Sequence, residues 1–375
     1  MKRISLFLLL FLLLKATVMY SQDGHPETNF RIVPVSPNAA SLGTYGLIPT
    51  DNYVGQARIS IPIYEIDLDG KKFPIALSYH TDGTRVAQEA TWIGLGWTLQ
   101  AGGCVVRQVQ GTDDFAARGC YNLTDAPWLT NPRFEVTDQN LEKYMGYFKG
   151  DYDAEPDMFY FNAGGHSGSM YFDVLKNNRQ LNAVPTIQTQ EKVVKMVYNT
   201  SNKTWTMTDL EGYVYSFSTK EITYYFLNTI DFFQTDITRS HIFPYYNEPQ
   251  IVTAWMLDSV TSPNGGKITF SYKKESIFTP ISTTEDVISL SKIVNGQLSS
   301  QSPQYFTNKF NYNYSYSKIE QWTLSAITFE GGKVEFGTTD REDIESAETG
   351  KKVQKLSSIK VSDTAGNLIK TTMLE

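Results

Sequence analysis

One short pattern recurs through the second half of the chain: an apolar strand, a glycine turn and a returning strand. Three such units follow one another, at 257–260 with 268–272, 324–327 with 334–336, and 356–359 with 368–372. Glycine supplies the positive φ that tight hairpin turns need. Because a lone hairpin cannot bury an apolar face, hairpins in series must join a curved sheet, a sandwich or a stacked array. The pattern therefore predicts an all-β fold.

The rest of the chain also has strand and turn character. Aromatic residues make up 13% of the sequence, and comparable hairpin units occur at 159–161 with 170–172 and 205–208 with 213–217. Nearer the N-terminus, runs 59–64 and 73–79 flank the turn Asp69-Gly70, and Pro62 and Pro74 should lie at a strand edge, start or bulge. Three- and four-residue apolar spacing predicts one short helix near 138–148.

These patterns divide the chain into segments by residue number. We expect a signal peptide over 1–21, a linker over 22–36, an N-terminal β region over 37–175 and a β-hairpin repeat region over 176–375. Within the last region, 275–308 is rich in Ser, Thr and Gln and predicts a polar excursion.

The first residues have the three parts of a secretory signal: basic Lys2 and Arg3, an apolar run over 4–14, and a short segment ending in Ser21. A membrane anchor is the alternative, but the run is shorter than the roughly 20 residues that a spanning helix needs. We expect cleavage between Ser21 and Gln22, although Met19 fits the −3 position poorly. The mature protein would then be exported, secreted or held at the outer cell surface, with no integral membrane segment.

Signal removal takes away three basic residues and no acidic one, which leaves 30 basic side chains against 40 acidic ones and a net charge of about −10. An acidic surface repels phosphate backbones, and no cluster of Lys or Arg interleaved with aromatics overrides that sign. Nucleic acid is therefore not an expected partner.

Two cysteines, Cys104 and Cys120, would meet an oxidising compartment after export. They are disulfide candidates, and two separate buried thiols are the alternative, because pairing requires Cα atoms within roughly 7 Å. The sequence has no C-x-x-C spacing that would indicate a metal or redox site.

The residues that commonly carry catalysis do not form a recognisable site. None of the four histidines stands in a metal-ligand spacing, and Ser167 in Gly165-His166-Ser167-Gly168 lacks the strand-to-helix context of a nucleophile elbow; the histidines are His25, His80, His166 and His241. No acid pair suited to a secreted hydrolase is evident. We expect a protein that is not an enzyme, with no catalytic residue, cofactor or metal.

Two further motifs admit a ligand reading and a structural one. Alternating Asp151, Asp153, Glu155 and Asp157 could ligate Ca²⁺ through oxygen, but solvated acids before a strand are the commoner outcome. The glycines around Gly94 and Gly102 lack the following helix of a phosphate loop, and close strand packing explains them better.

The segment 88–103, Gln-Glu-Ala-Thr-Trp-Ile-Gly-Leu-Gly-Trp-Thr-Leu-Gln-Ala-Gly-Gly, resembles the N-terminal lead-in of secreted Rhs/YD-repeat proteins of the Bacteroides type. Shorter matches to that family are 40–43, 45–46, 59–62, 77–80, 156–162 and 167–168. Its structural motif residues here are Trp92, Gly94, Gly96, Trp97, Gly102 and Gly103.

The resemblance implies an exported β scaffold, often part of a giant chain whose repeats build a shell beside a C-terminal toxin or effector module. The chain departs from that pattern, because it has no Y-D-x-x-G repeat and stops after the strand with Ile369. We therefore expect either a truncated or split member or a piece that covers only the lead-in. Its last strand would leave an open edge for a downstream repeat segment or a separate chain.

An alternative from another functional class is a cell-surface carbohydrate-binding or adhesin β-sandwich, in which exposed aromatics stack on sugars. The opposing view is that alternating Tyr and Phe fill a sheet interface. A lectin-like module would bind glycans as an isolated domain, whereas a shell segment would bind only its own downstream chain.

Overall fold

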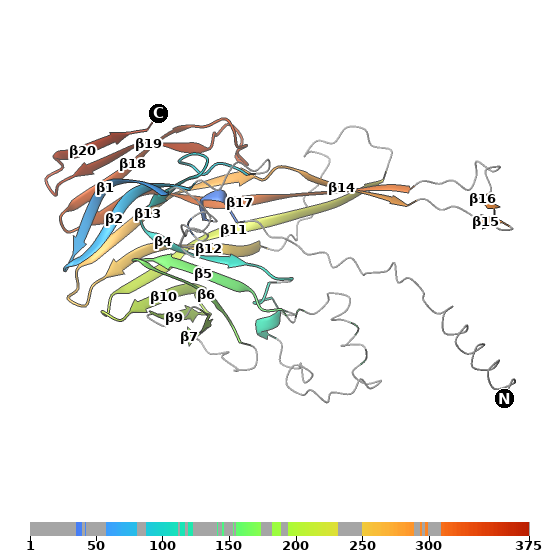
Figure 1. Cartoon of the computed structure of the whole chain (residues 1–375), viewed down its shortest axis with the longest axis horizontal. Coiled ribbons are helices and arrows are strands. Elements are labelled where there is room, and N and C mark those ends of the chain that lie inside the picture. The colour runs from blue at the N-terminus through green and yellow to red at the C-terminus, as the bar shows by residue number, and fades with distance from the viewer. Residues whose placement is uncertain are drawn as a thin grey trace, which may run out of the picture.

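The computed structural model is built almost wholly of antiparallel strands, which confirms the predicted all-β class. It describes residues 35–39, 42, 58–80, 88–111, 113–116, 119–122, 141, 145, 153, 155–173, 182–188, 194–231, 250–288, 293–294, 297–298 and 309–374. The strands form a three-stranded sheet, a 15-stranded sheet and a small two-stranded one (Figure 1).

The three-stranded sheet consists of β1 (Arg58–Leu68), β2 (Lys71–His80) and β3 (Trp97–Gln100). Asp69 and Gly70 both have positive φ and close the predicted β1–β2 hairpin. Pro62 lies beside a bulge of edge strand β1, and Pro74 lies where β2 has no β3 neighbour. Both prolines therefore occupy positions where a missing ladder donor costs little.

The large sheet contains a first wing that runs outward from β11 and β12. Its strands in sequence order are β4 (Gly103–Gln108), β5 (Met158–Ala163), β6 (His166–Tyr171), β7 (Asn182–Ala183), β8 (Thr186–Ile187), β9 (Val194–Asn199), β10 (Thr204–Asp209), β11 (Val214–Asp231) and β12 (Gln250–Thr261). The β5–β6 and β10–β11 hairpins confirm the two predicted upstream units.

A second wing consists of β13 (Lys267–Phe278), β17 (Lys309–Phe329), β18 (Gly332–Asp340), β19 (Gln354–Ser362) and β20 (Leu368–Met373). The sheet forks between the wings. Strand β11 pairs with β12 over 214–224 and then with β17 over 222–231, while β12 and β13 pair only at 259–261 and 267–269. At this fork the two wings diverge.

A long antiparallel arm extends from this fork, away from the body of the molecule (Figure 1). It contains the far halves of β11 and β17 together with β14 (Ser282–Ile288), which pairs with β17. Beyond it, β15 (Ile293–Val294) pairs with β16 (Gln297–Leu298). The segment predicted as a polar excursion, 275–308, thus begins with two strand pieces, the end of β13 up to Phe278 and then β14, because Ser- and Thr-rich sequence also suits a strand ladder.

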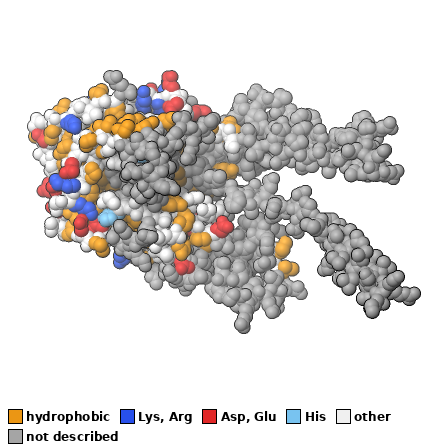
Figure 2. All heavy atoms as spheres, in the orientation of Figure 1, with side chains coloured by type: hydrophobic (Ala, Val, Ile, Leu, Met, Phe, Trp, Pro, Cys, Tyr) orange, Lys and Arg blue, Asp and Glu red, His pale blue; other side chains and the backbone are white. Residues whose placement is uncertain are grey.

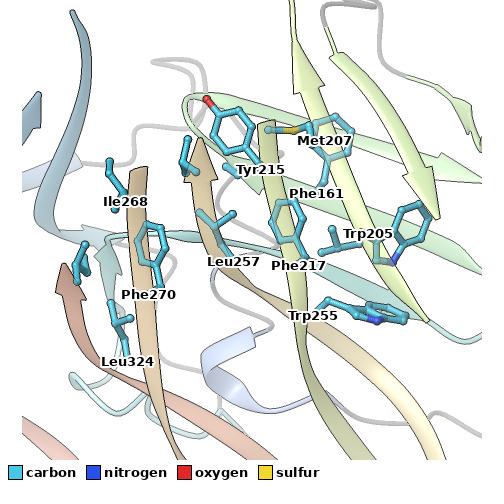
Figure 3. Packing of buried hydrophobic residues seen from close by; sticks show 14 of the residues in the cluster. Phe161, Trp205, Met207, Tyr215, Phe217, Trp255, Leu257, Ile268, Phe270 and Leu324 are labelled. Carbon is cyan, nitrogen blue, oxygen red and sulfur yellow. The ribbon is translucent and has the colours of Figure 1, made fainter. Parts of the chain in front are cut away.

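The three-stranded sheet packs face to face on the large sheet, and their facing side chains form the main core. Ile66 and Leu77 from the small sheet join Phe336 and Ile359 from the second wing in that core. In Figure 3, Trp205, Phe217 and Trp255 gather on neighbouring strands of the first wing. Burial of this aromatic-rich interface is the principal stabilising contribution.

Several sequence predictions fall on residues outside the described part of the chain. These are the signal over 1–21, the Ser21–Gln22 cleavage site, the linker up to residue 34, His25, His241, Asp151 and most of 138–148. Within the last segment only Leu141 and Met145 are described, and both have helical backbone with exposed side chains. None of the helical turns in the described residues has the length and hydrophobicity that a membrane crossing requires.

Candidate functional site

The Trp92 loop, residues 90–97, is a junction between the two sheets. Trp92 is buried, its N–H donates to the Oδ1 of Asn38 at 2.8 Å, and its carbonyl accepts from Leu356 N–H of β19 at 2.8 Å. Arg341 donates to the carbonyls of Ala90 and Thr91 from the far side. The loop therefore joins three segments that are distant in sequence, which is a structural task.

The glycines of the Trp92 loop and of the following turn are required by space and backbone geometry. Gly96 has a φ of 76°, and a Cβ there would lie 2.9 Å from the ring of Tyr79. Gly103 lies where β4 meets β5 so closely that a Cβ would be 2.4 Å from the carbonyl oxygen of Asn162. Gly94 and Gly102 also have positive φ. Strands β3 and β4 follow these glycines, whereas a phosphate loop leads into a helix.

Trp97 differs from Trp92 because it is only half-buried. Its ring packs at the margin of the main core and against Tyr79, with the two ring centroids 5.1 Å apart. Trp92 is therefore the anchor of the motif, and Trp97 adds a contact within the small sheet.

The N-terminal segment over 35–39 fills the fork of the large sheet. Ser36 donates its backbone N–H to buried Glu221 of β11 at 2.8 Å, and Asn38 donates to Gln321 of β17 at 3.3 Å. Ala39 is wholly buried beside Cys104 and Met256. This short segment thus bonds to both wings and covers the face of the first wing opposite the main core, although 36 was predicted to end a linker.

A buried charge cluster fixes the loop before the Cys120 turn. Arg107 of β4 donates through Nε to Asp157 at 2.8 Å and also contacts Asp113 and Asp157 through Nη2. Asp157 accepts further from Gln110 N–H at 2.7 Å. Asp157 therefore neutralises the buried Arg107 side chain and is not directed at a metal site. Glu155 of the same acidic run is exposed. Among the described residues no group of three or more His, Cys, Asp or Glu could hold a metal.

Asp114 completes this cluster with an unusual carboxyl group. Its carboxylate accepts from the Asp157 N–H at 2.9 Å, and its own N–H donates to the Asp157 carboxylate at 3.1 Å. Among the described residues, its buried Oδ1 has no hydrogen-bond partner. Burial and then the neighbouring charge of Asp157 raise the pKa of Asp114 to about 8. A proton on Asp114 lessens the carboxylate repulsion in this cluster.

The two cysteines lie in different surroundings and are both buried free thiols. Cys104 packs with Val106, Ala254 and Met256, whereas Cys120 begins the short 3₁₀ turn Cys120–Asn122. The alternative of two separate thiols therefore describes the structure. Burial raises both thiol pKa values, so neither cysteine is activated.

The described histidines and Ser167 occupy ordinary strand positions. His80 ends β2 and donates its backbone N–H to the Gly96 carbonyl at 3.0 Å. His166 begins β6, with Nε2 3.8 Å from Asp209, which pairs with Lys71 at 2.5 Å and so ties the small sheet to β10. Ser167 is exposed on strand β6. Strand β6 continues through Ser167, so the strand-to-helix turn of a nucleophile elbow is not formed at this described position.

The β20 edge, residues 368–373, exposes apolar side chains, and no packing contact in the described part of the chain accounts for them. Among the strands that the structure describes, β20 pairs only with β19, and Leu368, Ile369 and Met373 are 62%, 56% and 68% exposed. Apolar side chains left in water on an edge strand are the usual mark of an interaction surface. Figure 2 shows the wider face to be mixed, with charged and hydrophobic side chains interspersed. Sequence reasoning predicted the open edge but not the exposed side chains.

The fold and this edge together define an all-β protein with an uncovered edge strand. No family model matches the chain, and no curated protein matches it. The chain is similar to the Photorhabdus luminescens Tc holotoxin pore structure at 9% identity and a TM-score of 0.38, over 92% of this chain and 14% of that one. It is also similar to the N-terminal domain of effector protein SpvB from Salmonella typhimurium strain LT2, at 11% identity and a TM-score of 0.34, over 84% of this chain and 99% of that one.

Proposed function

We propose that this chain is an exported structural segment of an Rhs/YD-repeat-type protein, forming part of a β shell associated with a toxin or effector module. It works through surfaces, and no enzymatic activity is assigned to it. The partner is a downstream repeat segment or a separate chain that continues the large sheet. Proteins of this kind are secreted or held at the outer cell surface.

The observation that carries the proposal is the β20 edge. The strands β17 to β20 form consecutive antiparallel hairpins, and the series leaves β20 with one neighbour and three exposed apolar side chains. A soluble protein normally blunts or covers such an edge. A further strand added to β20 would satisfy its outer backbone groups and cover that apolar surface.

The carbohydrate-binding alternative has less support. Stacking on sugars requires aromatic rings that are open to solvent. Every aromatic side chain that the structure describes is buried or half-buried, so these residues provide no exposed platform. The aromatics instead fill the interface between the sheets.

The test is to sequence the genomic DNA beyond the codon for Glu375 and to express what it encodes with this chain. We expect a continuation or adjacent gene with Y-D-x-x-G repeats, and co-purification of its product with this chain through β20. A stop codon with no repeat-encoding neighbour would contradict the shell assignment, and glycan-array binding by the isolated chain would favour the alternative.

A further inference from the structure

The backbone of β20 has a defined set of outward-facing groups. Leu374 donates its N–H to the Ser357 carbonyl at 2.8 Å, so this residue faces β19. Successive residues of an antiparallel strand alternate between its two edges. Thr372 therefore also faces β19, whereas the N–H and C=O groups of Thr371 and Met373 point to the opposite edge. A strand added there would bond to these two residues.

The two faces of β20 differ in their surroundings. Lys370 extends toward the small sheet, where its Nζ donates to the carbonyl of Ile63, at the bulge of β1, at 2.8 Å. Met373 is paired with Ser358 and lies on the other face, together with Thr371. An added strand would thus place alternate side chains beside Lys370 and beside Met373.

The charge of the β19–β20 hairpin is opposite to that of the whole protein. The two strands contain Lys355, Lys360 and Lys370 and no acidic residue, whereas the chain has a net charge of −7. Lys360 lies opposite Glu335 on β18, and Glu335 pairs with Lys333 at 2.5 Å. Lys370 bonds to a backbone carbonyl. Lys360 is paired with Thr371 and so lies on the Met373 face, whereas Lys370 is the lysine of β20 itself, directly beside the position of an added strand. A carboxylate on the Lys370 face of an incoming strand would meet a lysine that no carboxylate of the hairpin neutralises.

We infer that the occupant of the β20 edge is an acidic, apolar strand that adds antiparallel to β20, with carboxylates on the Lys370 face and apolar side chains beside Met373. The inference rests on the proposed function, because it specifies the partner of the same edge. The antiparallel direction follows the pairing of the large sheet, and antiparallel ladders are the more stable per residue. This is strand addition in which the backbone supplies affinity and charge supplies selectivity.

The test uses the full chain and two labelled peptides, acetyl-Thr-Glu-Val-Glu-Ile-Glu-Thr-amide and the same peptide with lysine for each glutamate. By fluorescence anisotropy we expect the acidic peptide to bind about tenfold more tightly at low salt, since exchanging a repulsive for an attractive cross-strand pair at Lys370 changes the affinity by up to roughly that ratio. The ratio should fall in high salt. Lys370→Glu should reverse the preference.

A matched pair of proline variants separates edge pairing from general damage. Thr371→Pro removes an outward N–H and should abolish peptide binding while thermal unfolding changes little. Thr372→Pro removes an N–H directed at β19 and should lower the unfolding temperature. Hydrogen exchange at Thr371 and Met373 should slow when the acidic peptide binds.

The outcomes separate the inference from the proposed function. Equal binding of both peptides, with protection of Thr371 and Met373, would overturn the acidic partner and leave β20 as an assembly edge. Binding of neither peptide would overturn both the inference and the role of this edge. Peptide binding that Thr371→Pro leaves intact would overturn strand addition at β20.

Discussion

Two regions of the large sheet, β4 with β12 and β19 with β20, have the same antiparallel ladder but different surroundings. At β4 and β12 both faces are covered, since Val105 and Trp255 enter the main core while Cys104 and Ala254 face the N-terminal segment. At β20 most side chains on both faces are exposed. The two regions therefore share their backbone pairing and differ in how much apolar surface is buried on the two faces of the sheet, which is the larger source of stability.

The largest effect should come from the doubly covered region. Trp255→Ala removes a fully buried indole from the main core and should lower the free energy of unfolding by about 3–5 kcal/mol. Urea denaturation measures this loss. A loss below about 1 kcal/mol would mean that this region is not the packed centre of the protein.

The two tryptophans of the motif should differ from each other. Trp92→Ala should lower the free energy of unfolding by about 3 kcal/mol, because Trp92 is buried between the sheets. Trp97→Ala should cost roughly half as much, because Trp97 is half-buried. Equal losses in urea denaturation would contradict the assignment of Trp92 as the anchor.

Asp114 should make stability depend on pH. Its pKa is raised to about 8 in the folded protein, above the ordinary value of 3.8, so the folded state holds a proton that the unfolded state has lost. The contribution of this proton to the free energy of unfolding is complete below the ordinary pKa of 3.8 and is lost as pH rises through the folded-state pKa. The free energy of unfolding should fall by roughly 2 kcal/mol between pH 6 and pH 8 for one proton.

Asp114→Asn keeps the neutral shape and should flatten this dependence. The check is urea denaturation of both proteins across that pH range. The free energy of unfolding of the wild type should fall relative to that of the variant as pH rises. Parallel curves for the two proteins would show that Asp114 does not hold the proton.

The smallest effect should come from the open edge. Ile369→Thr changes a side chain that is 56% exposed, so the free energy of unfolding should move by no more than about 0.5 kcal/mol. Thermal unfolding of the isolated chain tests this. A large loss would show that β20 is already covered and would remove the contrast between the two regions.

The hairpins could be predicted because their signals are local. Asp69 and Gly70, or Gly366 before β20, set the turn from within the hairpin itself, and the alternating apolar residues follow at once. The Arg107 cluster could not be predicted in this way, because Arg107 and Asp157 are 50 residues apart. Acidic residues near a partner in space look the same in sequence as solvated ones.

The fork and its N-terminal segment show the same limit. Ser36 looks like linker sequence, yet it bonds to Glu221, 185 residues away. Strand β11 changes partner from β12 to β17 at about residue 222, with no turn residue to signal the change. The local sequence of a long strand does not indicate which strand it will pair with.

The sequence by itself determined the all-β class, the hairpin turns and the glycines of the Trp92 loop, since turn geometry and side-chain alternation act over a few residues. The tertiary structure alone decided which strands meet, which charges are buried and which apolar side chains stay exposed on β20. Those outcomes depend on contacts between distant segments, and their free energy comes from burying surfaces that no single segment contains.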